Sequence, residues 1–539
     1  KGLMMDLPRF FQKILLAVLL LFTTGGVLSI GPLSRANQTH PNSQLYLPII
    51  TTPSKCQVIQ TAAQTTDSTA QKLLQKFADS VTNGRQFYVS TSGRANGTGT
   101  VSDPWDLDSA LLQSDRVTGG DIIWVLGGTY KPVKEPIKYN VKISGTTTTP
   151  VFVRAYPGAL VTIDGGVEFY TDNVTFWGFN ITNTNPDRTA AESGSHPGDL
   201  DRGGGISVFA SNVSIINNII HEGEDGISAS SSAISTLLYG NIVFNNGWQG
   251  PDRGHGHGIY IQNDTGTKTA KENVVFNNFG GYSFHIYTEN GAIKNFNLSG
   301  NVVMNDKFLV GGLQPAANIF ITQNFVAMAK MQLGFSSQSN TGLTIQQNMI
   351  WDPAETPLQI SWWQNATVTN NCILTDTRPV LELTYPANRG TYRWNYNYYQ
   401  GSSTNGSFLL GNSSLSWSQW KSTTGYDINT EFSTTSFSSP DIFVRPNAYE
   451  SKRGNIIIFN WRSEPEVNVD ISALNLSAGD RYTLHNIQNY FAETISGTYS
   501  GSTITIPMTG WTVAKPIGWP DPLKDSTFPK FGVFLLTVP

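Results

Sequence analysis

The sequence predicts an all-β chain built largely as a solenoid, and a repeated pattern supports this prediction. Seven times between residues 218 and 373, Asn is followed by an apolar residue and then by Val or Ile. The short intervals are roughly 23 residues, within the range where a fixed period indicates stacked coils. The copies begin at Asn218, Asn241, Asn273, Asn301, Asn324, Asn348 and Asn371.

The composition agrees with a chain of strands and turns. Charged residues make up 14% of the chain, aromatic residues 11%, and 51 of the 539 residues are Gly. This profile is typical of an extended all-β protein with a sugar-like partner, and the length predicts two or more units. The net charge of -4 argues against a nucleic-acid partner, which requires a basic excess.

Two cysteines are too few for a disulfide framework. Cys56 lies in a polar segment, and Cys372 lies inside one of the Asn repeats. We therefore expect Cys372 to be a small buried thiol.

The N-terminus resembles an export signal. Arg9 and Lys13 precede an apolar run from Ile14 to Phe22, and Ser34-Arg35-Ala36 supplies the small residues of a cleavage site. We expect residues 1–36 to be a signal peptide and the protein to be secreted or at the cell surface. An uncleaved membrane anchor is the alternative.

A linker with a short amphipathic helix is expected over 37–86, with the helix at 67–82. Strand signals then begin at Phe87-Tyr88-Val89, followed by a Gly-rich turn, a short helical stretch from Asp106 to Leu112, and the buried strand 120–126. This order resembles the opening of secreted right-handed parallel β-helix proteins, a group rich in polysaccharide lyases. The resemblance covers about 87–400 and implies that the short helix caps the open end of the coil stack.

The repeats fade near residue 400, and residues 401–440 are expected to connect two domains. From Asp441 onward, runs of alternating residues separated by short turns predict a small C-terminal β-sandwich over 441–539.

Aligning the coils predicts which side chains point outward. A second strand follows each Asn strand, and its alternation places two columns outside. The first column is Ser207, Ser228, Tyr260, His285, Leu309, Gln332 and Gln359. The second is Phe209, Ser230, Gln262, Tyr287, Gly311, Gly334 and Ser361.

Two insertions enlarge the same corner of the coil, at 183–204 and 247–256. Insertions at one corner of a solenoid build one wall of a groove. This wall holds an unusual share of the chain's charged and aromatic residues, namely Asp187, Arg188, His196, Asp199, Asp201, Arg202, Trp248, Asp252, Arg253 and His255. Beside it lie Glu222, Glu224, Asp225, His257, Tyr282, Asp306, Lys307 and Lys330.

The first functional hypothesis is a polysaccharide lyase. Elimination from a uronic acid needs a base near the C5 proton and a positive group or Ca²⁺ to neutralise the carboxylate. His285 and Lys307 are candidate bases, and lyases of this fold use Lys, Arg or His. Arg253 is a candidate clamp for a carboxylate. Carboxylates at Asp199 and Asp201, with Glu224 and Asp225, are candidate Ca²⁺ ligands. Substrate contacts are expected from Arg253, His255, Tyr260, Tyr287 and Trp248.

The second hypothesis is a glycoside hydrolase. Glu224-Asp225-Gly226, with Gly256-His257-Gly258 one coil later, looks similar to motifs of polygalacturonase-type enzymes. The resemblance implies Glu224 as general acid, Asp225 as an activator of water and His257 as an orienting group. Gly204 stands where that family has a further acidic residue, and the family's Arg-x-Lys motif is absent. A non-catalytic glycan-binding or adhesin solenoid is the third hypothesis. The Asn repeats themselves are expected to be structural, with stacked side chains bonded from coil to coil.

Overall fold

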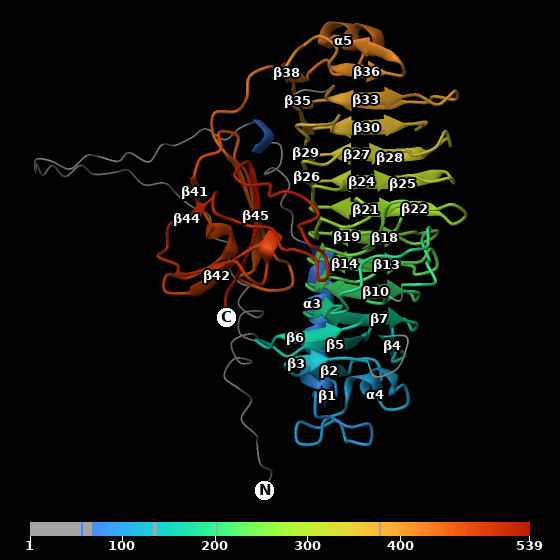
Figure 1. Ribbon diagram of the computed structural model, residues 1–539, viewed down its shortest axis with the longest axis vertical. Helices are drawn as coiled ribbons and strands as arrows, with labels where there is room; N and C mark the ends of the chain where they lie inside the picture. The colour runs from blue at the N-terminus through green and yellow to red at the C-terminus, as the bar shows by residue number, and fades with distance from the viewer. Residues whose placement is uncertain (1–54, 58–66, 133–136, 201, 377–378) are drawn as a thin grey trace, which may run out of the picture. The chain divides into compact units, whose positions relative to one another are not determined.

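A computed structural model describes residues 55–57, 67–132, 137–200, 202–376 and 379–539 (Figure 1). The predicted signal peptide and most of the predicted linker lie outside these residues. No helix in the described ranges is long and apolar enough to cross a membrane.

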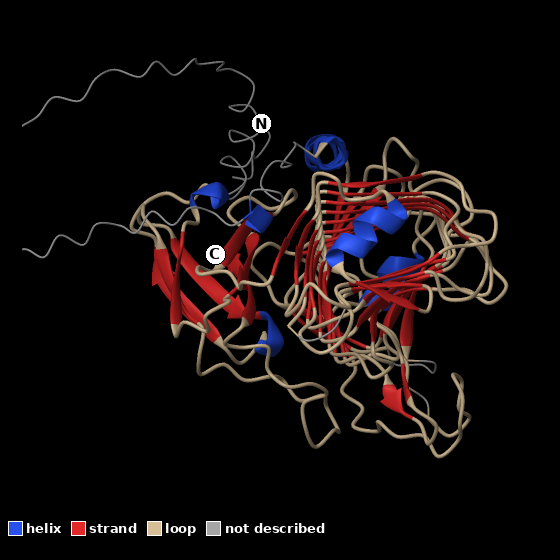
Figure 2. Ribbon diagram, turned by 90° about the horizontal axis from the view of Figure 1, so that it is seen from above, coloured by secondary structure: helices blue, strands red, loops and turns tan. Residues whose placement is uncertain are grey.

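Three sheets of 12 strands each run the length of the solenoid, and their strands stack in register when seen from above (Figure 2). Sheet 1 contains β1 (Gln86–Val89), β2 (Ile122–Val125), β5 (Val151–Ala155), β8 (Val174–Trp177), β11 (Ser214–Ile216), β14 (Leu237–Tyr239), β19 (Lys268–Lys271), β22 (Ile293–Ser299), β25 (Ala316–Thr322), β28 (Thr341–Gln346), β31 (Ala366–Thr369) and β34 (Tyr392–Asn395). Sheet 2 contains β4 (Lys138–Val141), β7 (Gly166–Phe169), β10 (Gly205–Val208), β13 (Ile227–Ala229), β18 (Ile259–Ile261), β21 (Tyr282–Ile286), β24 (Lys307–Val310), β27 (Met331–Leu333), β30 (Leu358–Ser361), β33 (Leu381–Thr384), β36 (Phe408–Leu410) and β37 (Ser413–Leu415). Sheet 3 contains β3 (Gly128–Tyr130), β6 (Val161–Asp164), β9 (Asn180–Thr182), β12 (Ile219–His221), β15 (Ile242–Phe244), β20 (Val274–Phe276), β23 (Val302–Met304), β26 (Phe325–Ala327), β29 (Met349–Trp351), β32 (Cys372–Leu374), β35 (Tyr398–Gln400) and β38 (Glu431–Ser433).

Neighbouring strands within these three sheets are parallel, apart from the antiparallel pair β36–β37 at one end. Each coil contributes one strand to each sheet, and the inward side chains form one continuous apolar core. The predicted parallel β-helix is confirmed. Strands β36 and β38 extend the sheets past residue 400, so the expected connecting segment 401–440 forms the last coil and its cap.

Short helices cover both ends of the stack. Helix α4 (Leu107–Leu112) begins at Asp106, whose side chain accepts a hydrogen bond from the Ser109 N–H, and buries Leu107 and Leu111 in the core. Helix α5 (Trp417–Thr424) covers the other end with Trp420 (Figure 1). Helix α3 (Ser68–Asn83) lies instead against the outer face of sheet 1, near Trp177. The covered ends protect backbone groups that an open solenoid leaves unpaired.

The Asn repeats form the buried ladder that the sequence predicts. The side-chain oxygen of each Asn accepts hydrogen bonds from both the backbone N–H and the side-chain amide of the Asn one coil before it, as in the pair Asn241–Asn218, at 3.0 and 3.1 Å. The ladder continues to an eighth copy, Asn397. Asn side chains at a coil corner thus satisfy buried backbone donors that a chain turning this tightly leaves without a strand partner.

The C-terminal domain is a small sandwich, as predicted. A five-stranded antiparallel sheet packs against a two-stranded one around an apolar core. The larger sheet contains β39 (Asp441–Pro446), β40 (Gly454–Phe459), β45 (Phe531–Thr537), β42 (Arg481–Asn486) and β43 (Thr494–Thr498), and the smaller one β41 (Glu466–Val469) and β44 (Ile504–Pro507). Two 3-10 turns, η1 (Ser472–Leu474) and η2 (Ile487–Asn489), complete the domain.

The larger C-terminal sheet also packs against the outer face of sheet 3, which we call the covered face. Apolar side chains from both domains form this contact, among them Phe276, Met304, Trp351, Ile457 and Phe459. The outer face of sheet 2, which carries the predicted columns, is called the open face.

The expectation of a buried free thiol at Cys372 is wrong. Cys372 forms a disulfide with Cys56 across a sequence separation of 316 residues. Both residues are fully buried in the apolar contact at the covered face. The sequence could not predict the bond, since only the tertiary fold brings the segment around Cys56 to this sheet.

Candidate functional site

The first outward column lies on the open face in the predicted register. Ser207, Ser228, Tyr260 and His285 pair in successive strands of sheet 2. Leu309, Gln332 and Gln359 continue the row. Neighbours in the row are separated by the strand spacing, about 4.8 Å. Glu168 precedes Ser207 in the same row, one coil before the point where the sequence alignment began.

Rings gather where the row crosses β18 and β21, and we call His257, Tyr260, Tyr282, His285 and Tyr287 the ring cluster. The His285 ring is stacked against Tyr260, Tyr282 and Tyr287, with centroids at 5.3, 4.6 and 4.9 Å. The His257 ring lies 4.1 Å from it. The exposed ring of Phe335, which sequence reasoning missed, extends the cluster beside Tyr287. The fold therefore brings together five residues that the sequence analysis placed in two separate columns and beside the corner.

The two imidazoles of the ring cluster are held neutral. Burial, together with the neighbouring His257, lowers the pKa of His285 to about 2. Burial also lowers the pKa of His257, against an opposing effect from Asp225. The Nδ1 atoms of both rings are buried, and neither has a hydrogen-bond partner within the described parts of the chain. Unpartnered buried nitrogens are costly unless a ligand or water completes them.

Asp225 supports the ring cluster from the corner of the coil. Its Oδ1 accepts a hydrogen bond from the His257 backbone N–H at 2.6 Å. The glycines that follow both residues are required by close packing, because a Cβ on Gly226 would lie 2.4 Å from the Gly258 carbonyl oxygen. The Asp-Gly and His-Gly pairs therefore have a structural role in turning the chain onto the open face.

Lys307 stands at the edge of the ring cluster. It begins β24, opposite Tyr282, and its Nζ lies 6.0 Å from the centroid of the Tyr282 ring. Lys330 is the matching residue one coil later, as the Phe308 N–H to Lys330 carbonyl bond shows, and its Nζ lies 3.9 Å from Glu382. Lys307 is half-buried, so its ammonium group can meet a ligand bound over the rings.

Asp306 lies behind Lys307 at the end of a second, shorter ladder. Its Oδ2 accepts hydrogen bonds from the Asn278 N–H at 2.7 Å and the Ser283 hydroxyl at 3.3 Å. Asn278 in turn accepts from Asn246. Burial raises the pKa of Asp306 to about 6. This ladder fixes the corner from which β21 and β24 enter the open face.

The two corner insertions form a wall, as predicted, and they pair with each other. The Gln249 N–H donates to the Arg188 carbonyl and the Ala190 N–H donates to the Gln249 carbonyl. The second insertion contains a two-stranded antiparallel ribbon, β16 (Trp248–Gln249) and β17 (Gly254–His255).

Inside this wall His255 is not placed to contact a substrate, contrary to expectation. Its ring is buried, stacked on Trp248 with centroids at 5.2 Å, and its Nε2 lies 3.0 Å from Asp252. Arg253 is exposed and pairs with the other oxygen of Asp252 at 2.7 Å. The ribbon buries the side of the insertion that carries His255. A ribbon with only two residues per strand leaves no periodic pattern in the sequence, so this burial could not be predicted.

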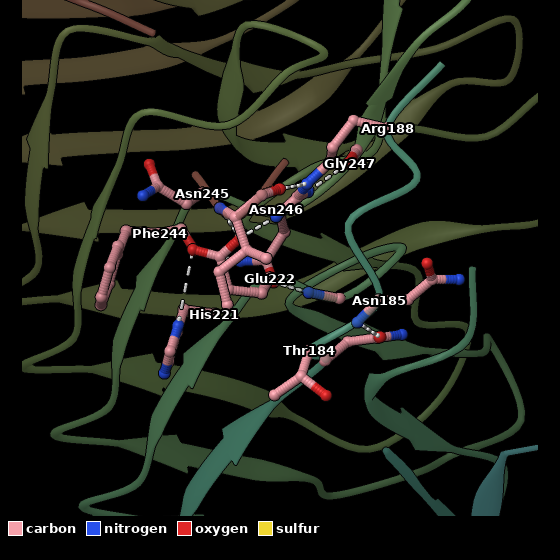
Figure 3. Close-up of polar contacts among 12 residues, drawn as sticks. Thr184, Asn185, Arg188, His221, Glu222, Phe244, Asn245, Asn246 and Gly247 are labelled. Atoms are coloured by element: carbon pink, nitrogen blue, oxygen red, sulfur yellow. Dashed lines mark hydrogen bonds and ion pairs between the residues drawn. The ribbon is translucent and has the colours of Figure 1, made fainter. Parts of the chain in front are cut away.

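A buried polar network fixes the wall to the rest of the molecule (Figure 3). The Arg188 guanidinium donates to the Glu222 carboxylate, to the Gly247 carbonyl at 2.5 Å and to the Ile517 carbonyl at 2.9 Å. Glu222 also accepts from the Ile517 N–H at 3.0 Å. Arg188 and Glu222 are nearly inaccessible to solvent. The network therefore joins the first insertion, the coil corner and a C-terminal segment.

The Ca²⁺ site expected at Asp199 and Asp201 stays a prediction. Asp199 accepts a hydrogen bond from the Ala191 N–H at 2.5 Å, within its own loop. Asp201 lies outside the described residues. No group of three or more His, Cys, Asp or Glu side chains suited to a metal ion is present in the described ranges.

Glu224 and Trp248 line a pocket of about 290 Å³ beside the wall, on the lower coils of the open face. Its other walls come from β4, β7 and β10 and from the first insertion. The sequence predicted that these two residues lie near the groove. It did not predict that Lys138 and Glu168 line the same pocket.

No family model matches the chain. A segment of 80 residues is 41% identical to pectate lyase PEL9 from Emericella nidulans, and it spans 14% of this chain and 18% of that protein. The chain resembles a pectate-lyase-like β-helix protein, as its sequence predicts.

Two solved structures are similar at low identity. Pectate lyase Pel9A is 14% identical with a TM-score of 0.33, over 67% of this chain and 81% of that one. A lacto-N-biosidase from Eubacterium ramulus is 13% identical with a TM-score of 0.34, over 60% of this chain and 69% of that one.

Proposed function

We propose that the protein is an extracellular polysaccharide lyase that cleaves a uronate-containing polysaccharide on the open face. The observation that carries the proposal is the convergence of the ring cluster with Lys307 and Asp225. Flat rings stack on sugar rings, and a cation beside them meets the carboxylate or the acidic proton of a uronate. The local similarity to a pectate lyase supports the same reaction class.

The reaction needs one base and one means of neutralising the carboxylate. A base removes the proton at C5, the electron pair forms the C4–C5 double bond, and the glycosidic oxygen leaves C4 and takes up a proton. Stabilising the negative charge that develops next to the carboxylate lowers the barrier.

We propose Lys307 as the base and the ring cluster as the surface that positions the sugar. A pKa of about 2 makes His285 a weak proton acceptor, since general bases work best with a pKa near the working pH. Neutral His285 and His257 retain ring nitrogens that can form hydrogen bonds with sugar hydroxyls. Ca²⁺ remains a candidate for charge neutralisation, but the described residues do not fit a resident site and no step is assigned to it.

The test is formation of an unsaturated uronate, followed by ultraviolet absorbance, on a panel of acidic polysaccharides with and without a chelator. Lys307→Met should reduce kcat by about 10²–10⁴-fold, because Met has no group that can accept a proton. Lys330→Met is the matched control one coil away and should change kcat less than about threefold. Full activity in Lys307→Met would reject Lys307 as the base.

His285→Gln separates positioning from proton abstraction. A positioning role predicts a raised KM with kcat largely kept, whereas loss of kcat equal to that of Lys307→Met assigns the base to His285.

A glycoside hydrolase is the second candidate, supported by Glu224 and Glu168 in one pocket wall. New reducing ends without ultraviolet absorbance would select the hydrolase. Binding without any product would select the glycan-binding solenoid.

A further inference from the structure

The pocket beside the wall has features of a binding site of its own. Its volume is about 290 Å³, and it lies on β4, β7 and β10, below the ring cluster. The first insertion closes it with His196, Pro197, Leu200 and Arg202, and the second insertion contributes Trp248. Both insertions are additions to the repeat, so the pocket is specific to these coils.

Two donors in the lining lack partners. The indole Nε1 of Trp248 and the Nε of Arg202 are buried, and neither finds an acceptor within the described ranges. Trp248 is 4% exposed and Arg202 is 3% exposed. The remaining guanidinium nitrogens of Arg202 are used, by the carbonyls of Asn185, Asp187 and Glu222. A ligand with acceptor oxygens completes donors of this kind.

Among the described residues of the lining, charges of both signs are present in equal number. Lys138 and Arg202 contribute two positive charges, and Glu168 and Glu224 contribute two negative charges. The Lys138 Nζ donates to Glu168 at 2.6 Å. A lining with both donors and acceptors but no excess charge favours a neutral, hydroxyl-rich ligand over an anionic one.

An exposed aromatic pair borders the same carboxylate. Tyr170 and Phe209 stack with centroids at 5.3 Å, and each remains nearly half exposed. The Tyr170 hydroxyl donates to Glu168. Exposed paired rings next to a polar pocket form a surface on which a sugar ring can stack.

The pocket and the ring cluster lie along one row of strands. From β10 to β21 there are three steps, because β13 and β18 lie between them. At about 4.8 Å a step, the separation along the stack is roughly 14 Å. One extended oligosaccharide of a few residues can therefore reach both places.

We propose that this pocket is a subsite for a neutral sugar residue, carried by the same polysaccharide whose charged residue binds over the ring cluster. The second half of this statement rests on the proposed function, whereas the binding of a neutral sugar does not. The substrate class is thus a heteropolysaccharide in which a neutral residue or branch lies a few sugars from the cleaved bond.

The experiment measures binding of free galactose, xylose, rhamnose and galacturonic acid to the full chain by saturation-transfer NMR. At least one neutral sugar should bind more tightly than galacturonic acid. Trp248→Phe removes the unpartnered donor but keeps a ring against His255, and should weaken binding about 2–10-fold, the value of one hydrogen bond. Trp351→Phe, on the covered face, is the matched control and should leave binding unchanged.

Glu168→Gln, which keeps the size of the side chain, provides a second variant if Trp248→Phe does not fold, and it should also weaken neutral-sugar binding. Lys307→Met should bind the neutral sugar as the unmodified protein does, which separates this proposal from the lyase proposal. Absence of neutral-sugar binding, preference for galacturonic acid, or binding insensitive to both pocket variants would overturn it.

Discussion

The open face and the covered face belong to the same coils but present different outward residues. On the covered face the outward row reads Phe244, Phe276, Met304, Ala327 and Trp351. On the open face the corresponding coils present Tyr260, His285, Leu309, Gln332 and Gln359. The inward side chains of both sheets are equally apolar and lie in one core.

This difference shows that, in a solenoid, different residues determine the fold and the contacts of each face. The inward side chains stabilise the coiled fold, and the outward side chains of each sheet determine what packs against or binds to that sheet. An apolar outward row requires a protein partner, here the C-terminal sheet, because exposing it to water is unfavourable. Apart from the fully buried Leu309, the open-face row consists of rings and amides, which are compatible with water and with sugars.

The largest expected effect tests the covered face. Phe276→Ala removes a fully buried ring that stacks on Phe244, and should lower the free energy of unfolding by about 3–5 kcal/mol while leaving substrate binding unchanged. Chemical denaturation measures the first effect and NMR titration the second. A loss below 1 kcal/mol would show that the C-terminal sheet does not pack here in solution.

The second-largest loss of stability is expected for the buried Arg188–Glu222 network at the corner between the two faces. Arg188→Met leaves the buried Glu222 without its cation and should cost about 3 kcal/mol, near the lower end for a broken buried pair because the Ile517 N–H still binds Glu222. Since this network fixes the wall, activity should fall as well. Arg253→Met, an exposed cation of the same wall, is the control and should cost less than about 0.5 kcal/mol.

The next effect depends on pH, because each face contains a histidine that burial keeps neutral. Burial lowers the pKa of His221 to about 3, beside Phe244, and that of His285 to about 2. Both values lie below about 6.5, the usual value in an unfolded chain, so the unfolded state binds more protons as the pH falls. The stability from each is therefore complete above about pH 6.5 and decreases toward pH 3, by at most about 1.4 kcal/mol per pH unit.

Urea denaturation at several pH values measures this loss, and the comparison with His285→Gln isolates one histidine. The variant should lose less stability between pH 6.5 and 4 than the unmodified protein. Parallel curves for the two proteins would contradict the neutral state of His285.

The smallest effect is expected at the upper part of the open face. Gln332→Ala should change the free energy of unfolding by less than about 0.5 kcal/mol, because the side chain points outward and is only half-buried. If the substrate extends beyond the ring cluster, the KM of the Gln332→Ala variant should rise for long polysaccharides. Its KM for short oligosaccharides should stay constant. A large loss of stability would show that this face is covered by protein too.

Much of the site was predictable because strand alternation and a fixed repeat leave little freedom. Tyr260 and His285 were placed side by side from the sequence alone, since one step along the stack is one repeat. The same logic predicted the Asn ladder and the shared corner of the two insertions. It did not extend to Glu168, which lies one coil before Ser207, the first residue of the aligned column.

The insertions were less predictable because they have no period. Trp248 and His255 lie in a short ribbon, and local packing decides which of its faces is buried. Their burial therefore cannot be predicted from the spacing of residues in the sequence. Lys138 and Trp248 meet in one pocket although they are 110 residues apart in the sequence.

The sequence by itself determined the coil, its inward core, its buried Asn ladder and the row of rings on the open face, because each follows from a period of two within a period of roughly 23. The tertiary structure alone decided the Cys56–Cys372 bond, the covering of sheet 3 and the pocket beside the wall. These depend on segments that approach one another from distant parts of the chain, and such contacts are selected by packing and burial of the whole fold.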